Sequence, residues 1–334
     1  MANGYTEHYG LCQWAAEDSF LREEFNQDNA KIDGALNTLS EELSEAQEEN
    51  EEKLDPIRYN LYQLWLQRYY EGKETGMKKA LLFDGFLDGS LVAALTQGTF
   101  LHGGSVWLSG TGQDSITGQT QTGGIAAQGG TVESDVVTAD GYGYLTGCTL
   151  EESYLGASAS AVVTVTVEFL LNGKVQAARQ VTMRGSESVF SISAGKSIPV
   201  CPGDTFQMKL TAPENDWLRF TRSAANGNHV AAGFAFTSGA AASGTLTSTA
   251  FAVDGTIQKA RLYLRRRGGS ASPSLNGTAM TWLSARETVD EDGSACQEDS
   301  WELSGIQSPL TVKLALDRGS DGTMEVLDYG MVLL

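Results

Sequence analysis

Apolar residues recur at intervals of three and four along residues 25–46, and the positions between them are polar or small. The outer positions carry a run of glutamates over residues 41–52. A narrow apolar stripe backed by charge is typical of a coiled coil, and not of a helix that packs on a globular core. We therefore expect residues 18–80 to form a helical stalk. Its heptad positions a and d hold Phe25, Ile32, Leu36, Leu39, Leu43 and Ala46, and its oligomer core is expected at Ile32, Leu36, Leu39 and Leu43.

Two asparagines, Asn29 and Asn50, also fall at position a. Polar residues at this position lower the stability of a coiled coil but fix its register, which favours a short parallel homo-oligomer. So few heptads leave the choice between a dimer and a trimer open. The alternative is an amphipathic helix that packs within one chain.

Proline and aspartate interrupt the helical pattern near its middle. Asp55 and Pro56 suit the N-cap and the first position of a second helix, and a proline inside a continuous helix loses a hydrogen bond and clashes with the preceding turn. We expect the first helix to begin near Asp18. A second helix over residues 57–71 should meet it near Leu54, or one helix should be sharply kinked there.

From about residue 81 the pattern changes to short alternating runs separated by Gly, Asn and Asp. The pair Asn172-Gly173 between two such runs predicts a β-hairpin. Turn signals at roughly 8–12-residue spacing are typical of a β-sandwich or jelly roll. The expected fold class is α+β by segment: a helical coiled-coil stalk, then two antiparallel β-sandwich or jelly-roll-like domains. The expected boundaries are 1–17 for an attachment peptide, 18–80 for the stalk, and 81–240 and 241–334 for the sandwiches.

The formal net charge of −19 narrows the range of partners. Nucleic acid and anionic membranes attract basic surfaces, so we expect neither as a partner. The four cysteines have neither zinc-ligand nor disulfide-framework spacing, which indicates free thiols. The beginning of the chain has no secretory signal pattern, and no apolar run approaches membrane-spanning length. We expect synthesis and assembly in a cytoplasm.

Large apolar side chains are concentrated in the first 25 residues. Leaving each of them in water forgoes roughly 1.5–3 kcal/mol, so they should be buried. They can pack on their own helix or dock on another protein, and we favour docking. The expected docking residues are Tyr5, Tyr9, Trp14, Phe20, Leu21 and Phe25.

Three elements stand out in the first 36 residues: His8, Tyr9, Gly10, Leu11, Gln13 and Trp14; Asp18, Phe20, Leu21, Arg22, Phe25 and Asn26; and Lys31, Ile32 and Asp33. With these elements the segment resembles the N-terminus of tail-fibre or baseplate-appendage proteins from phages and prophages of Firmicutes. The resemblance implies a structural virion protein of the tail, assembled in the cytoplasm of a bacterial host and docked by its N-terminus on tail or baseplate proteins with its β modules outward. Such proteins are usually trimeric, so the resemblance favours a homotrimer.

No catalytic, metal or cofactor motif is evident, and we expect no enzyme activity, metal or cofactor. The acidic loop at residues 287–292 is the nearest approach to paired carboxylates, and it is more typical of a solvated turn. A receptor-binding role, in which the last domain recognises a host cell-surface glycan, is the alternative function. Its candidate contacts are Trp217, Trp282 and Trp301. We expect Arg265 and Arg267, which share one face of a strand, to pair with carboxylates across a subunit contact.

Overall fold

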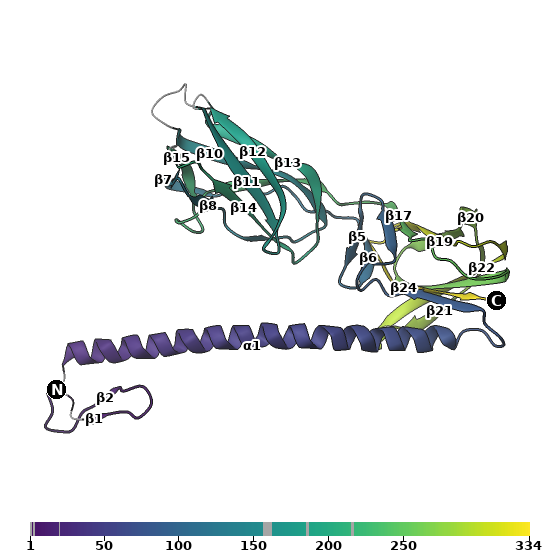
Figure 1. The fold of residues 1–334 in the computed structure, drawn as a ribbon, viewed down its shortest axis with the longest axis horizontal. Coiled ribbons are helices and arrows are strands. Elements are labelled where there is room, and N and C mark those ends of the chain that lie inside the picture. The colour runs from purple at the N-terminus through teal and green to yellow at the C-terminus, as the bar shows by residue number, and fades with distance from the viewer. Residues whose placement is uncertain (1, 3, 20, 156–161, 185–186, 215–216) are drawn as a thin grey trace. The chain divides into compact units, whose positions relative to one another are not determined.

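The computed structural model describes the chain except for residues 1, 3, 20, 156–161, 185–186 and 215–216 (Figure 1). The fold is mostly antiparallel β-sheet. The chain divides into two compact units, Met1–Trp65 and Leu66–Leu334. The first unit is largely helical, and the second contains the sheets.

The first unit begins with a small hairpin and continues into a long helix. Strands β1 (Gly4–Tyr5) and β2 (Cys12–Gln13) pair antiparallel. Helix α1 (Arg22–Glu71) starts four residues later than the expected start at Asp18. Glu23 and Glu24 lie in its first turn, where negative side chains stabilise a helix by interacting favourably with its dipole.

Our prediction of two helices meeting near Leu54 is wrong, because α1 runs through Pro56 without a break. A proline inside a helix removes one backbone hydrogen bond and adds a local clash. Lys53 and Leu54 before Pro56, and Arg58 and Leu61 after it, are good helix formers, which offsets this cost. The last turn of α1, residues 66–71, belongs to the second unit.

The middle of the chain folds into a sandwich of two antiparallel sheets, here called the middle sandwich. Apolar residues of both sheets face one core, which includes Val165, Phe169, Phe206 and Phe220. In the described residues, one sheet has the order β13-β10-β15-β7 with β16 on β10, and the other has β12-β11-β14-β8 with β9 on β14. The bounds are β7 (Thr120–Gln128), β8 (Thr131–Glu133), β9 (Val137–Thr138), β10 (Gly143–Leu155), β11 (Val162–Leu171), β12 (Lys174–Arg184), β13 (Val189–Val200), β14 (Thr205–Thr211), β15 (Trp217–Ser223) and β16 (Ala232–Ser238).

The hairpin predicted at Asn172-Gly173 is confirmed. These residues join β11 to β12, with Leu171 opposite Lys174. Asn172 and Gly173 have φ angles of 49° and 72°, as a tight turn with two left-handed residues requires. Asn-Gly supplies that conformation at little steric cost.

The second sandwich, here called the terminal sandwich, contains the C-terminal strands. Its core includes Leu246, Leu262, Val312 and Met331. In the described residues, one sheet has the order β20-β19-β23-β17-β4, and the other has β21-β22-β18-β24-β6-β5 with β3 on β24. The bounds are β3 (Ala80–Asp84), β4 (Val92–Leu95), β5 (Thr99–His102), β6 (Ser105–Ser109), β17 (Ser243–Ser248), β18 (Ile257–Arg267), β19 (Ser270–Leu275), β20 (Thr278–Ala279), β21 (Thr281–Val289), β22 (Ala295–Ile306), β23 (Val312–Asp317) and β24 (Thr323–Leu333).

The strand pairing corrects the expected domain boundaries. We expected residues 81–109 in the first sandwich, but β3 and β6 pair with β24, and β4 pairs with β17. The middle sandwich is therefore an insertion into the terminal sandwich. The chain leaves and returns at adjacent points, where Ser109 bridges Ala240. Gly239 fits here because a Cβ atom would lie 2.5 Å from the Tyr142 carbonyl oxygen.

Buried ion pairs connect the strands of the seven-stranded sheet to the end of α1. Arg265 and Asp328 form a fully buried pair, and the Tyr70 hydroxyl donates to Asp328. Arg267 pairs with Asp290 and Glu325 of the same chain. Our prediction that Arg265 and Arg267 pair across a subunit contact is therefore wrong, because the neighbouring strand β24 and the turn after β21 of the same chain supply their carboxylates.

A second buried carboxyl, Asp84, predicts an unusual pH dependence of stability. It accepts the Phe86 backbone N–H at 2.8 Å, and its other oxygen has no hydrogen-bond partner among the described residues. Burial raises the pKa of Asp84 to about 6 from its ordinary value of 3.8, and Asp88 and Asp328 act in the same direction. The Asp84 carboxyl therefore binds a proton more tightly in the folded state than in the unfolded state.

Because the pKa of Asp84 is raised on folding, its contribution to the free energy of unfolding falls as pH rises from about 4 to about 6. We expect Asp84→Asn to raise the free energy of unfolding by about 2–3 kcal/mol near pH 7 and to change it little near pH 4. Urea unfolding of both proteins at the two pH values measures this difference. An equal effect at both would contradict the assignment.

Candidate functional site

The N-terminal hairpin is held against the first turns of α1 by polar contacts. The Cys12 backbone N–H donates to Asp28 at 2.7 Å, and the Trp14 indole N–H donates to Glu24 at 3.2 Å. The Lys31 ammonium donates to the Gly10 carbonyl oxygen. Glu24, Asp28 and Lys31 are four and three residues apart, so they share one face of the helix. The hairpin and the helix start thus form one folded head.

The aromatic side chains of this head have different environments. Tyr5 and Tyr9 are 62% and 63% exposed, and Leu21 and Phe25 are also exposed. Trp14 is half-buried beside Glu24. Trp14 is thus partly packed on the chain's own helix, whereas Tyr5 and Tyr9 present their rings to solvent. Phe20, also expected at the docking surface, lies outside the described residues.

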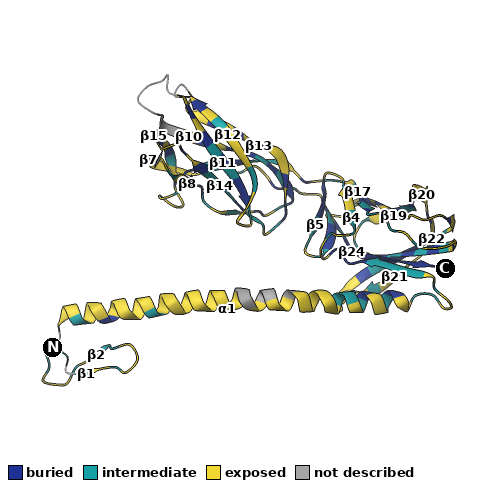
Figure 2. Ribbon diagram, in the orientation of Figure 1, coloured by how far each residue is buried: buried dark blue, intermediate teal, exposed yellow. Residues whose placement is uncertain are grey.

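The apolar stripe of α1 is exposed in the single chain (Figure 2). Exposed fractions of the four expected core residues run from 43% for Ile32 to 60% for Leu36 and Leu39. Leu43 is similar at 58%. The structure thus brings these side chains to the surface, in contrast to the closed cores of the sandwiches. We call the stripe Ile32–Leu36–Leu39–Leu43 the first seam.

The three tryptophans considered for glycan contact differ. Trp301 in β22 is only 4% exposed and belongs to the terminal core, so the prediction of a ligand contact there is wrong. Its cross-strand neighbour Trp282 is 59% exposed on β21, at the edge of the sheet. The side chain of Trp217 lies outside the described residues, although its backbone belongs to β15.

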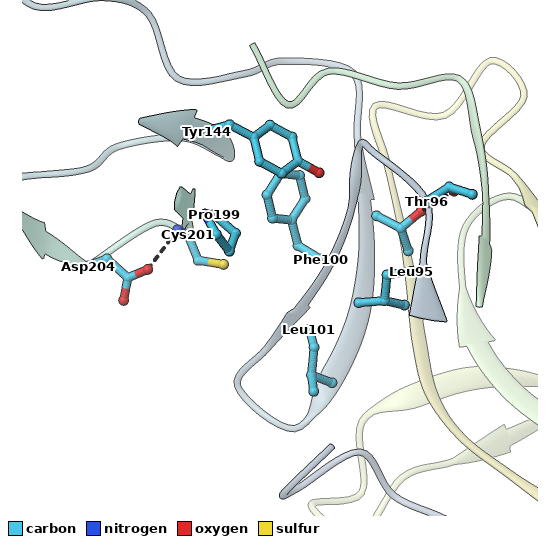
Figure 3. Close-up of a pocket in the computed structure, with 9 residues that line it drawn as sticks. Leu95, Thr96, Phe100, Leu101, Tyr144, Pro199, Cys201 and Asp204 are labelled. Atoms are coloured by element: carbon cyan, nitrogen blue, oxygen red, sulfur yellow. Dashed lines mark hydrogen bonds between the residues drawn. The ribbon is translucent and has the colours of Figure 1, made fainter. Parts of the chain in front are cut away.

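A pocket of about 390 Å³ lies where the two sandwiches meet (Figure 3). The rings of Phe100 and Tyr144 form its apolar wall, with centroids 5.1 Å apart. Its polar groups have protein partners: the Gly98 N–H donates to the Tyr144 hydroxyl at 2.8 Å, and the Cys201 N–H donates to Asp204 at 2.7 Å. Burial raises the pKa of Cys201 to about 12, which keeps its thiol protonated. The pocket is a part of the inter-domain packing.

A second pocket, of about 380 Å³, brings together polar residues that the sequence did not single out. Asp135 lines it, and the Ser223 hydroxyl donates to Asp135. His229 Nδ1 lies 2.8 Å from the other Asp135 oxygen. In a catalytic triad the histidine lies between serine and carboxylate, whereas here the carboxylate lies between serine and histidine. The cluster ties the turn at residues 224–229 to the segment after β8.

The separation of 94 residues between Asp135 and His229 explains why sequence reasoning missed this cluster. In the acidic segment at 287–292, expected as a loop, residues 287–289 belong to strand β21, and Asp290 has a structural role in the turn that follows. Asp290 accepts backbone N–H groups from Asp292 and Ser294 at 3.0 and 2.8 Å, and it pairs with Arg267. Within the described residues, no group of His, Cys, Asp and Glu side chains has the arrangement of a metal site.

The described cysteines form no disulfide, in agreement with the expected free thiols. Cys148, Cys201 and Cys296 are buried. Among the described residues, no helix has both the length and the apolar character needed to cross a membrane.

Comparison with known proteins adds little to this picture. No protein-family model matches the chain, and no curated protein sequence matches it. Among solved structures, the chain is similar to the N-terminal CBM22-1–CBM22-2 tandem domain of Xyn10C from Paenibacillus barcinonensis. The identity is 9%, the alignment covers 78% of this chain and 100% of that one, and the TM-score is 0.16. At that score the likeness supports neither a fold assignment nor a ligand.

Proposed function

We propose that this protein is a structural tail-fibre or baseplate-appendage subunit of a phage or phage-tail-like particle. It docks by its N-terminal head and assembles as a homo-oligomer, with a trimer favoured, through a coiled-coil stalk. The observation that carries the proposal is the exposure of the first seam and of the head aromatics in a chain whose sandwiches close their own cores. Burying such side chains requires another protein surface.

The two kinds of exposed surface serve different contacts in this proposal. Tyr5 and Tyr9 are aromatic groups with a polar tip, a residue type that is enriched at protein interfaces. We assign them to docking on a tail or baseplate protein. The first seam has the heptad spacing that another helix requires, and we assign it to copies of the same chain. The sandwiches form the body of the appendage.

The docking assignment predicts a large loss of incorporation for Tyr5→Ser combined with Tyr9→Ser. Both rings are exposed, so the head should keep its fold while its apolar contact area is lost. Particles assembled with this variant, or with residues 1–25 deleted, should contain little of the protein on immunoblots of purified particles. Glu7→Ser in the same hairpin is the matched control and should incorporate normally. Normal occupancy of the deletion variant would refute the docking assignment.

The alternative function, recognition of a host cell-surface glycan, is favoured by Trp282. Its exposed indole ring on an edge strand offers an apolar face. Sugar rings can pack on such a face while their hydroxyl groups bond to neighbouring polar groups. This role is compatible with a docked appendage whose terminal sandwich meets the host surface.

We expect Trp282→Ala to abolish adsorption of the purified chain to envelope fractions of the host, measured by pull-down and glycan array. Val289→Ala, which changes an exposed apolar side chain at the other end of β21, is the control and should adsorb normally. The whole chain must be used, because a fragment of residues 241–334 lacks β3–β6 of the terminal sandwich. Equal adsorption by both variants would leave only the structural role.

A further inference from the structure

A second apolar stripe continues along α1 beyond the first seam. Leu54, Ile57, Leu61 and Leu64 are separated by three, four and three residues, and they are between 43% and 63% exposed. Because α1 continues through Pro56, they lie on the same uninterrupted helix as the first seam. We call these four residues the second seam.

The two seams are not in the same heptad frame. Continuing the first frame beyond Asn50 would keep Ile57 and Leu64 at position a, but it would place Lys53, Asn60 and Gln67 at position d and leave Leu54 and Leu61 outside the stripe. The apolar residue instead follows Asn50 by four positions, at Leu54. Such an insertion of four residues into a heptad pattern is a stutter, and it locally unwinds a left-handed supercoil. From Ala46 to Ile57 the spacing is eleven residues, which corresponds to about 3.67 residues per turn.

We propose that α1 forms one parallel, in-register bundle with copies of this chain from the first seam through the second, and that the stutter at residues 50–54 fixes the register. This inference rests on the proposed homo-oligomer. It extends the interface by about two turns past Pro56 and defines how the copies align.

The stutter itself identifies the occupant of the second seam. A bundle that unwinds at one height needs every helix to unwind at the same height. A parallel, in-register copy meets this condition at every position. An antiparallel copy meets it only when the two helices cross at residue 52, and residues 22–32 would then have no helix beside them because α1 ends at Glu71.

The asparagines at position a support the same alignment. In a parallel, in-register bundle Asn29 meets Asn29 and Asn50 meets Asn50 of the other copies. A carboxamide has both donor and acceptor groups, so identical asparagines can hydrogen-bond to one another inside the bundle. Leu54 and Ile57 then occupy positions a and d, a combination that shifts coiled coils toward trimers and tetramers.

Cysteine cross-linking of the full-length chain tests the alignment. In a Cys12→Ser background, Leu36→Cys reports on the first seam and Leu61→Cys on the second. Gln63→Cys is the matched control, because two residues turn the helix by about 200° and direct its side chain away from the seam. After oxidation with copper phenanthroline, non-reducing gels measure disulfide-linked chains.

We expect interchain disulfides for Leu36→Cys and Leu61→Cys, several-fold more than for Gln63→Cys. Cross-linking at Leu36→Cys with none above the control at Leu61→Cys would overturn this inference and leave the proposed homo-oligomer intact. Failure at both positions would overturn both. Mixing Leu36→Cys with Leu61→Cys chains should add no mixed product, and such a product would indicate a shifted or antiparallel register.

Discussion

Replacing Leu36 and Leu43 with aspartate should convert the assembled protein into a monomer. In the oligomer each leucine side chain is removed from water, which contributes roughly 1.5–3 kcal/mol per residue in every chain. Aspartate forfeits this contribution and places several like charges in one apolar core, which costs more than the lost burial. In the single chain both leucines are exposed, so the substitution should leave the fold of the monomer unchanged.

Light scattering coupled to size exclusion measures this change. The wild-type protein should have a mass near three times the 35.7 kDa of one chain, and the variant a mass near 35.7 kDa. Thr38→Asp combined with Ser44→Asp adds the same two charges outside the stripe and is the matched control. A wild-type monomer, or a control that dissociates as completely as the variant, would contradict the stalk.

The charge distribution of the stalk predicts how the stability of the oligomer depends on salt. No lysine or arginine lies between Lys31 and Lys53, while seven glutamates lie at residues 41–52. Parallel copies therefore bring acidic segments together, and this repulsion opposes assembly. Because dissolved salt screens exposed charges, the oligomer should become more stable as ionic strength rises. A bundle held mainly by salt bridges would respond in the opposite sense.

Replacing Asp328 with alanine should strongly destabilise the terminal sandwich. The Arg265 guanidinium donates to Asp328 through Nε at 3.0 Å and also through Nη2, and both side chains are fully buried. The Tyr70 hydroxyl donates to the same carboxylate. Removing the carboxylate leaves a buried cation without its bidentate partner, which costs about 3–5 kcal/mol. Glu291, at 3.9 Å from Arg265, is too distant to replace it.

Thermal unfolding followed by circular dichroism measures this effect, and we expect the midpoint to fall by about 10 °C. The surface pair Lys209–Glu133, at 2.7 Å, supplies the control, because both side chains are about a third exposed. Glu133→Gln should shift the free energy of unfolding by less than about 1 kcal/mol. Arg265→Met combined with Asp328→Leu should recover much of the loss, since no unpaired charge remains buried. Equal effects of Asp328→Ala and Glu133→Gln would refute a special role for the buried pair.

The hairpin at Asn172-Gly173 was predictable from the sequence, whereas the domain boundaries were not. The alternation in residues 162–184 and the pair Asn172-Gly173 predicted a hairpin, because both signals act between neighbouring residues. Nothing local distinguishes β3 and β6 as partners of β24, more than 200 residues further along the chain. Pairing at that separation depends on which apolar faces close one core, so the insertion of the middle sandwich was not predictable.

Some residues of the candidate sites were also predictable from the local sequence, and others were not. The exposed first seam could be read from spacing, since a 3.5-residue period belongs to one helix. Trp282 and Trp301 are similar in sequence surroundings, yet one is exposed and the other belongs to the core. Burial depends on the opposite sheet, which the local sequence does not specify. The cluster of Asp135, Ser223 and His229 was missed for the same reason.

By itself the sequence determined the local features of this protein: the helical stripe with its Asn positions, the aromatic head, the turns and the acidic charge. These follow from backbone geometry and from residues within a few positions of each other. Only the tertiary structure decided that Arg265 and Asp328 pair inside one chain and that the middle sandwich interrupts the terminal one. Each of these depends on contacts between distant segments, whose energies become available only when the chain has closed its cores.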